Sequence, residues 1–235
     1  MLKFQLLDAN EWFYFYGSSE IPYPLVMINL PYIANNIFPG ITKKKLYIVD
    51  ADIVGAPVVF SENNIIFLST EGAELYARNV YQVAHELCHF YINSSQKQRT
   101  MFWFEEVICE MTSHYFLEEY SKRNIWDENS RSIPYLQYSQ QTLSDVEVFN
   151  HKKLMMYQSD EINHLIQNPT DRLKNRYLAS LLLPIFRKQP TLFEELPKLA
   201  NLYGIPDFEL FLKAWYDSAA PKNQFAIQEI IEIFY

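Results

Sequence analysis

The sequence contains only two cysteines, a single short run of basic residues and no long hydrophobic run. Two cysteines, Cys88 and Cys109, cannot form the disulfide framework of a small secreted protein, and they fit a reducing compartment. The net charge is −8, whereas nucleic-acid binding requires clustered Lys and Arg that neutralise phosphates. The only basic run, Lys43–Lys45, is most simply a solvated turn. These features argue against a nucleic-acid partner.

The absence of a long apolar run also argues against a membrane segment. The longest apolar stretch, Ala179–Phe186, contains Pro184 and is far shorter than the roughly 20 residues of a helical span. The first residues, Met1–Glu11, lack the uninterrupted apolar core of a signal peptide. We therefore expect a cytoplasmic protein. Since 49% of the residues are hydrophobic and 16% are aromatic, the chain can build a substantial core.

The segment His85–His89 has the H-E-x-x-H pattern, and the surrounding Val80–Tyr91 places apolar residues at helical spacing. Residues four apart lie on one face of a helix, so His85 and His89 can bind the same metal ion. Zinc suits two imidazoles, and at catalytic sites it keeps one position open. A chance pair of histidines on a core-facing helix would leave buried imidazoles unpaired, which is costly. Glu86 is the expected general base.

A second helix is expected over Trp103–Leu117, where apolar residues recur every three or four positions without Gly or Pro. Catalytic zinc takes three protein ligands, and this segment can supply the third. Glu106 and Glu110 share a face, which favours Glu106 as the ligand and Glu110 as the carboxylate that accepts the outer N–H of a zinc histidine. Glu105 points away and is expected to be a solvated charge near the helix N-terminus. His114 is the alternative ligand.

These two segments resemble the gluzincin zinc metallopeptidases, which include thermolysin-like enzymes, aminopeptidase-N-like enzymes and minigluzincins. The resemblance rests on His85–His89 followed by Trp103–Glu106. In the aminopeptidase-N-like group the ligand glutamate follows a W-x-x pattern, which matches Glu106. In thermolysin-like enzymes an acidic residue four positions after the ligand supports a zinc histidine, which matches Glu110. The resemblance implies a zincin-like fold and hydrolysis of peptide bonds.

Three segments before the motif predict strands: Lys45–Asp50, Gly55–Phe60 and Asn64–Ser69. The middle segment contains Pro57, which lacks an N–H, so we expect it at the edge of the sheet. An edge strand can pair with an extended peptide, and the gluzincins bind substrate in this way. A plain sheet edge without substrate contact is the alternative.

Hydrolysis also requires a donor to the developing oxyanion. The gluzincins use a Tyr or a His from the helical region after the zinc helices, and Tyr177 in Asn175–Leu182 matches this position best. His151 and His164 are alternatives, and an ordinary core tyrosine is another interpretation of Tyr177.

The two cysteines both lie on the predicted metal helices. A redox switch or an additional soft ligand is one interpretation of Cys88 and Cys109. We expect instead that they pack as small apolar residues, because free cysteines usually do so. Helix geometry also separates Cys88 from the ligand face.

The best candidate boundary is Ser121–Pro134, where charged residues, Asn and Ser replace the apolar pattern. The fold class predicted is α+β: residues 1–120 form a zincin-like subdomain with a small mixed β-sheet, the H-E-x-x-H helix and a ligand-bearing second helix. Residues 135–235 form a helical subdomain packed against it in one compact unit. Its helices are predicted over Thr142–Tyr157, Asp171–Phe186, Leu192–Leu202, Phe208–Tyr216 and Asn223–Phe234.

The sequence thus predicts a zinc-dependent metallopeptidase that acts on a peptide or protein, with zinc bound by His85, His89 and Glu106 and with Glu86 as the base. One alternative is a regulatory protease with one dedicated protein substrate, resembling the phage-repressor-directed metallopeptidases. The other is a catalytically silent zincin-fold binding protein. Glu86 argues against this last alternative, because a structural metal site needs no base.

Overall fold

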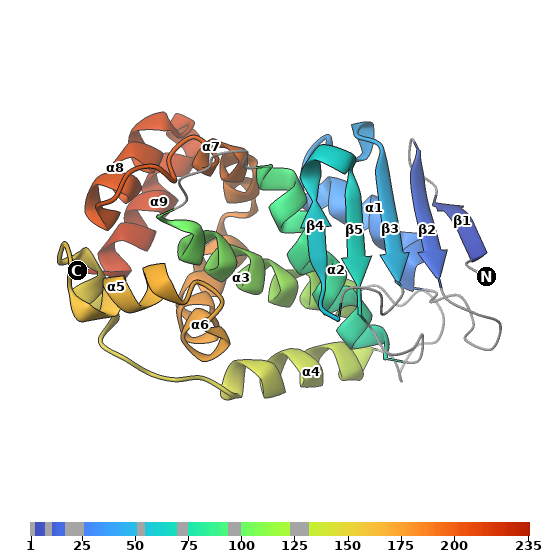
Figure 1. Ribbon diagram of the computed structural model, residues 1–235, viewed down its shortest axis with the longest axis horizontal. Coiled ribbons are helices and arrows are strands. Elements are labelled where there is room, and N and C mark those ends of the chain that lie inside the picture. The colour runs from blue at the N-terminus through green and yellow to red at the C-terminus, as the bar shows by residue number, and fades with distance from the viewer. Residues whose placement is uncertain are drawn as a thin grey trace. The chain divides into compact units, whose positions relative to one another are not determined.

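The protein is an α+β protein with a five-stranded mixed sheet and nine α-helices among the residues described (Figure 1). The computed structural model describes residues 3–7, 11–16, 26–50, 55–69, 75–93, 100–122 and 132–235. The helices are α1 (Val26–Ile37), α2 (Tyr76–Ile92), α3 (Phe102–Ser121), α4 (Ser132–Ser144), α5 (Asp160–Gln167), α6 (Arg172–Lys188), α7 (Leu196–Leu199), α8 (Phe208–Ser218) and α9 (Pro221–Ile233).

The chain divides into two compact units that are each built from two segments. The first contains Met1–Tyr91 and Thr112–Gln140, and the second contains Ile92–Met111 and Gln141–Tyr235. Helix α3 is continuous across the division, so its first half belongs to the second unit and its second half to the first. The predicted boundary at Ser121–Pro134 falls mostly on residues outside those described.

The first unit contains the sheet, whose strand order is β1-β2-β3-β5-β4. The strands are β1 (Lys3–Leu7), β2 (Trp12–Tyr16), β3 (Leu46–Asp50), β4 (Val58–Phe60) and β5 (Ile65–Leu68). The central strands β2, β3 and β5 are parallel, whereas β1 and β4 pair antiparallel at the two edges. The strands predicted from the sequence are confirmed as β3, β4 and β5, with β4 at an edge. The first two strands were not predicted.

The sheet has one fully buried face. Tyr14 pairs with Ile48, and Ile48 pairs with Ile66; all three side chains are 0% exposed. Residues between them point the other way and are half-buried, as Phe13 and Tyr47 are, with ring centroids 5.4 Å apart. This alternation follows from the period of two in a strand, and it requires a cover for the buried face.

Helices α1 and α2 supply this cover, and Figure 1 shows them on the same face of the sheet. In α1 the side chains of Met27, Leu30 and Ala34 recur at helical spacing and are each 0% exposed. Helix α2 is tied to the end of β5, because the Gln82 side chain bonds both the N–H and the carbonyl of Ser69 at 3.1 and 2.9 Å. These two bonds fix the position of α2, which carries the H-E-x-x-H motif.

The second unit has an aromatic core formed by the first half of α3 and by α8. The ring of Phe104 lies 5.4 Å from Phe208, 5.5 Å from Phe211 and 6.2 Å from Trp215 between centroids. Helix α8 begins at Asp207, whose carboxylate accepts the Leu210 N–H at 2.9 Å and so caps the first turn. The core therefore depends on two segments that are about a hundred residues apart in the chain.

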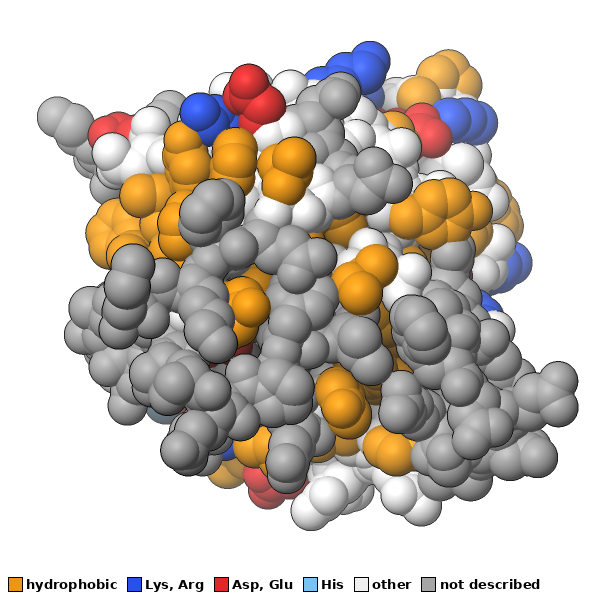
Figure 2. Space-filling model, turned by 90° about the vertical axis from the view of Figure 1, so that its right-hand side faces the viewer, with side chains coloured by type: hydrophobic (Ala, Val, Ile, Leu, Met, Phe, Trp, Pro, Cys, Tyr) orange, Lys and Arg blue, Asp and Glu red, His pale blue; other side chains and the backbone are white. Residues whose placement is uncertain are grey.

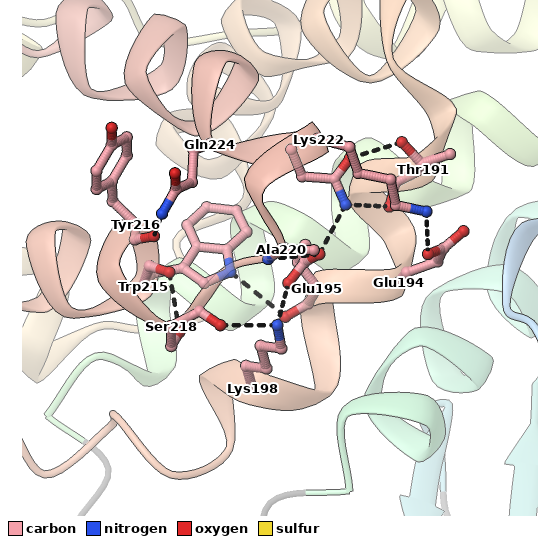
Figure 3. A network of polar contacts seen from close by, with 11 residues as sticks. Thr191, Glu194, Glu195, Lys198, Trp215, Tyr216, Ser218, Ala220, Lys222 and Gln224 are labelled. Atoms are coloured by element: carbon pink, nitrogen blue, oxygen red, sulfur yellow. Dashed lines mark hydrogen bonds and ion pairs between the residues drawn. The ribbon is translucent and has the colours of Figure 1, made fainter.

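A buried carboxylate links three further segments of this unit (Figure 3). Glu195 is 2% exposed; it accepts the Ala220 N–H at 3.2 Å and the Asn223 amide at 2.7 Å. The Nζ of Lys198 also forms an ion pair of 2.6 Å with the Glu195 carboxylate. The Trp215 indole also donates to the Glu195 carbonyl oxygen at 3.3 Å. Glu195 thus joins the turn before α7 to α8 and to the start of α9.

The helices predicted over the second part of the chain are partly confirmed. Helices α6, α8 and α9 confirm three of them, but the helix predicted over Thr142–Tyr157 is wrong, because α4 ends at Ser144 and a 3-10 helix occupies His151–Met155. The Glu147 N–H donates to the Leu173 carbonyl at 3.2 Å rather than within a helix. The helix predicted over Leu192–Leu202 is mostly a 3-10 helix followed by the short α7.

Several large hydrophobic side chains reach the surface, among them Leu6 and Tyr32, which are 57% and 62% exposed. Figure 2, which looks onto the side of β1, shows hydrophobic side chains of the described residues on this face. Single exposed apolar residues are normal on protein surfaces. Across the described ranges, no helix has the length and apolar character needed to cross a membrane.

Truncation of Leu212 on α8 tests the aromatic core. Leu212 is 0% exposed, so Leu212→Ala should lower the free energy of unfolding by about 2–5 kcal/mol, because it leaves a cavity. Leu210 on the same helix is 58% exposed, and Leu210→Ala should cost less than about 0.5 kcal/mol. Urea unfolding followed by circular dichroism measures both. Equal effects of the two variants would contradict the described packing of α8.

A second prediction concerns the charge of Glu195. Burial alone would raise the pKa of Glu195, but hydrogen bonds from Lys198, Asn223 and the Ala220 N–H outweigh it and lower the pKa. The folded state therefore favours the ionised form. This stabilisation is present above the unfolded pKa of about 4.3 and is lost as the pH falls through the lower folded pKa. Glu195→Gln should lower the free energy of unfolding at pH 7 by about 1–3 kcal/mol.

Glu195→Gln should lose less stability than the wild type when the pH is lowered below about 4.3, because a glutamine at position 195 takes up no proton. Urea unfolding at neutral and acidic pH measures this. Glu194→Gln is the matched control, since Glu194 is more exposed and pairs only with Lys222 at the surface. An unchanged pH dependence in Glu195→Gln would contradict the role assigned to its carboxylate.

Candidate metal centre

The H-E-x-x-H motif lies in the second half of α2, as predicted. The helix contains no Gly or Pro, and its apolar residues Val83 and Leu87 are 1% and 0% exposed. His85 is half-buried and His89 is 8% exposed, and their ring centroids lie 5.0 Å apart. The helical spacing thus places two imidazoles side by side, one turn apart, in a mostly buried environment.

A sulfur atom completes a group of three potential ligands. The ligand atoms of His85, His89 and Cys109 all lie within 4.8 Å of one another. Cys109, on α3, is 0% exposed. Among the histidine, cysteine and acidic side chains of the described residues, these three form the group that could hold a metal ion.

The donor set fits zinc. Zinc binds imidazole nitrogen at about 2.0–2.1 Å and cysteine sulfur at about 2.3 Å. Two ligand atoms of one tetrahedral ion lie about 3.5 Å apart, given these bond lengths. The limit of 4.8 Å on the separations among His85, His89 and Cys109 is wider than this, so a small shift of the side chains would bring all three onto a single ion. Three protein ligands leave one of the four zinc positions open.

Glu86 follows His85 directly, so the two side chains point about 100° apart around α2. Its side chain is 5% exposed, and it is not part of the metal-binding group found in the described ranges.

The acidic residues in the first half of α3 are all buried. Glu105, Glu106 and Glu110 are 1%, 9% and 4% exposed. The expectation that Glu105 is a solvated charge is therefore wrong, because α3 has no solvent-facing side over this stretch. Glu110 forms an ion pair of 3.4 Å with the Nε of Arg176, a partner that the sequence did not indicate. Glu106, the predicted ligand, lies one turn before Glu110.

His114, the alternative ligand, has a different environment. It is 0% exposed; its Nδ1 lies 2.9 Å from the Ser139 hydroxyl, and its ring packs edge-on against Tyr81. The structure therefore does not bring His114 into the group formed by His85, His89 and Cys109.

Tyr177, the predicted oxyanion donor, is bonded within the second unit. Its hydroxyl lies 2.9 Å from Nδ1 of His151, and Nε2 of His151 lies 3.1 Å from the Ile233 carbonyl oxygen. Because the carbonyl can only accept, Nε2 carries a proton and Nδ1 accepts from the tyrosine. The other alternative, His164, pairs with Asp171 at 2.8 Å. Tyr177 and His151 thus join α6 to the end of α9.

The sequence alone does not predict Cys109 as a ligand. A soft ligand is one interpretation of the two cysteines, but packing as small apolar residues is the expected one. Cys88 fits the packing role, since its sulfur accepts a hydrogen bond from Thr112 at 3.5 Å. The sequence spacing was compatible with Cys109 as a ligand. Cys109 lies three residues after Glu106, so the two side chains leave α3 on neighbouring faces.

Tyr177→Phe tests the hydrogen bond to His151. Removing the hydroxyl leaves the His151 acceptor unpaired, and we expect a loss of about 1 kcal/mol in the free energy of unfolding. Urea unfolding measures it, with Tyr157→Phe as the control because Tyr157 is 58% exposed. Wild-type stability in Tyr177→Phe would contradict a structural role for this bond.

The site is thus defined by its own geometry: two histidines one turn apart on α2 and the sulfur of Cys109 on α3. Comparison with known proteins adds no relative to this description. No protein-family model matches the chain, and neither a curated protein nor a solved structure matches it.

Proposed function

We propose that this protein is a zinc-dependent metallopeptidase of the gluzincin type. The observation that carries the proposal is the placement of the His85 and His89 rings, 5.0 Å apart, within one group of potential metal ligands. The retention of Glu86 next to this pair supports hydrolysis rather than a structural metal site. A mixed sheet whose edge strand β4 precedes β5 and α2 is compatible with a zincin-like fold.

His85 and His89 would hold the ion through imidazole nitrogens, and α3 would supply the third ligand. Glu106 is the candidate from the sequence, and Cys109 is the residue whose donor atom lies beside the histidines. Zinc bound there would act as a Lewis acid and would lower the pKa of water to about 7. Glu110, paired with Arg176, would stabilise the ligand-bearing turn of α3.

Glu86 would perform the proton transfers. Its carboxylate would take a proton from the attacking water and would deliver it to the nitrogen of the leaving amine. Its side chain is 5% exposed, so the carboxylate lies inside the protein, where the histidines of the proposed site also lie. The products would be two shorter peptides.

The substrate would bind as an extended segment along β4. This strand lies at the edge of the sheet, and Val58 and Val59 are half-buried while Phe60 is 46% exposed. Backbone groups on a free edge can add a strand. Tyr177 would donate to the oxyanion only after it releases His151. The two free cysteines support a reducing compartment, and we propose the cytoplasm.

The decisive variant is Glu86→Gln, which keeps the shape of the side chain and removes its basicity. Metal content should stay at the wild-type level, whereas peptide cleavage should fall by about 10²–10⁴-fold, as expected for loss of a general base. Zinc content is measured by atomic emission, and cleavage is measured with a peptide library analysed by mass spectrometry.

Glu194→Gln is the matched control, because Glu194 is an exposed glutamate that belongs neither to the metal-binding group nor to the strand proposed to bind the substrate. It should keep both zinc and cleavage. Equal cleavage by the wild type and Glu86→Gln would reject Glu86 as the base. Zinc binding without cleavage of any library peptide would favour a protease dedicated to one protein substrate or a silent binding protein.

A further inference from the structure

Helix α3 brings the sulfur of Cys109 next to the two histidines of α2. The Sγ atom lies within 4.8 Å of the ligand nitrogens of His85 and His89, and the cysteine is 0% exposed. We infer that Cys109 binds the proposed metal ion as its third protein ligand, in the thiolate form. The inference rests on the proposed metal site, and it identifies a ligand that the sequence pattern does not select.

Glu106 and Cys109 compete for this position. They are three residues apart on α3, so their side chains point about 60° apart around the helix. Over the described residues, the group that forms with His85 and His89 contains Cys109 and does not contain Glu106. The observed arrangement therefore favours sulfur.

The other cysteine provides a comparison within the same structure. Cys88 is also 0% exposed, but it is not part of the metal-binding group. Its sulfur accepts a hydrogen bond from the Thr112 hydroxyl at 3.5 Å. Cys88 thus behaves as a buried cysteine usually does, as a small apolar residue with a weak polar contact. Cys109 differs from it because two imidazole nitrogens lie beside its sulfur.

The chemistry of this donor set is consistent with catalysis. Binding of the ion displaces the thiol proton of Cys109, which passes to solvent, and the resulting thiolate is the ligand. Two imidazoles and one thiolate occupy three of the four positions around zinc, so one position stays open. Sulfur also favours zinc over magnesium or calcium, since those ions prefer oxygen.

Cobalt substitution tests the ligand directly. Co²⁺ replaces zinc in such sites, and a thiolate ligand gives a sulfur-to-cobalt charge-transfer band in the near ultraviolet that nitrogen and oxygen ligands do not give. Metal-free full-length protein is titrated with Co²⁺ in three forms: wild type, Cys88→Ser and Cys109→Ser. We expect the band in the wild type and Cys88→Ser at about one Co²⁺ per chain.

In Cys109→Ser the band should be absent, and Co²⁺ should bind at least about tenfold more weakly, because loss of even an outer-shell partner costs about 10–100-fold. If Cys109→Ser does not fold, the wild type and Cys88→Ser still identify the ligand, since the chain has only two cysteines. Circular dichroism checks the fold of each variant.

Three results would overturn the inference. Co²⁺ binding without the band would exclude a thiolate ligand and would leave the proposed function intact; loss of binding in Glu106→Gln would then assign the ligand to Glu106. Loss of the band in Cys88→Ser would assign it to Cys88. Failure of the wild type to bind either Co²⁺ or Zn²⁺ would overturn the proposed metallopeptidase as well.

Discussion

The burial of ionisable side chains on α3 is the constraint on which the site depends. Every residue from Trp103 to Leu117 is buried, and Glu105, Glu106 and Glu110 lie within this stretch. A buried charge that lacks a partner costs several kcal/mol, so such a helix is stable only where cations or hydrogen-bond donors meet it. Arg176 does this for Glu110. A bound metal ion would bring a further positive charge close to the same helix.

The elements that the sequence could predict are those set by local spacing. The apolar period around His85 predicts α2, and the short apolar run within Lys45–Asp50 predicts β3. The elements missed depend on distant contacts. Helix α1 contains Pro31, and the helix predicted over Thr142–Tyr157 is replaced by a segment whose Glu147 bonds the backbone of Leu173. Tertiary hydrogen bonds outweigh local preference there.

The candidate site likewise has one part that local spacing predicts and one part that depends on contacts between helices. His85, Glu86 and His89 lie on one turn of one helix, so their spacing alone fixes their mutual positions. The third ligand comes from another helix, and its identity depends on how α3 is rotated about its own axis. The spacing that placed Glu106 and Glu110 on one face could not give that rotation. It is the sulfur of Cys109 that lies beside the histidines.

Helix α3 is shared by the two units, so the chain crosses from one unit to the other more than once. The polypeptide passes from one unit to the other after Tyr91, within α3, and again after Gln140. A fragment that ends at Gln140 would keep Phe104 but lose α8, whose rings surround it. The complementary fragment would lack half of its own core. No single cut of the chain can therefore release either unit whole, because each unit is assembled from two segments that the other interrupts.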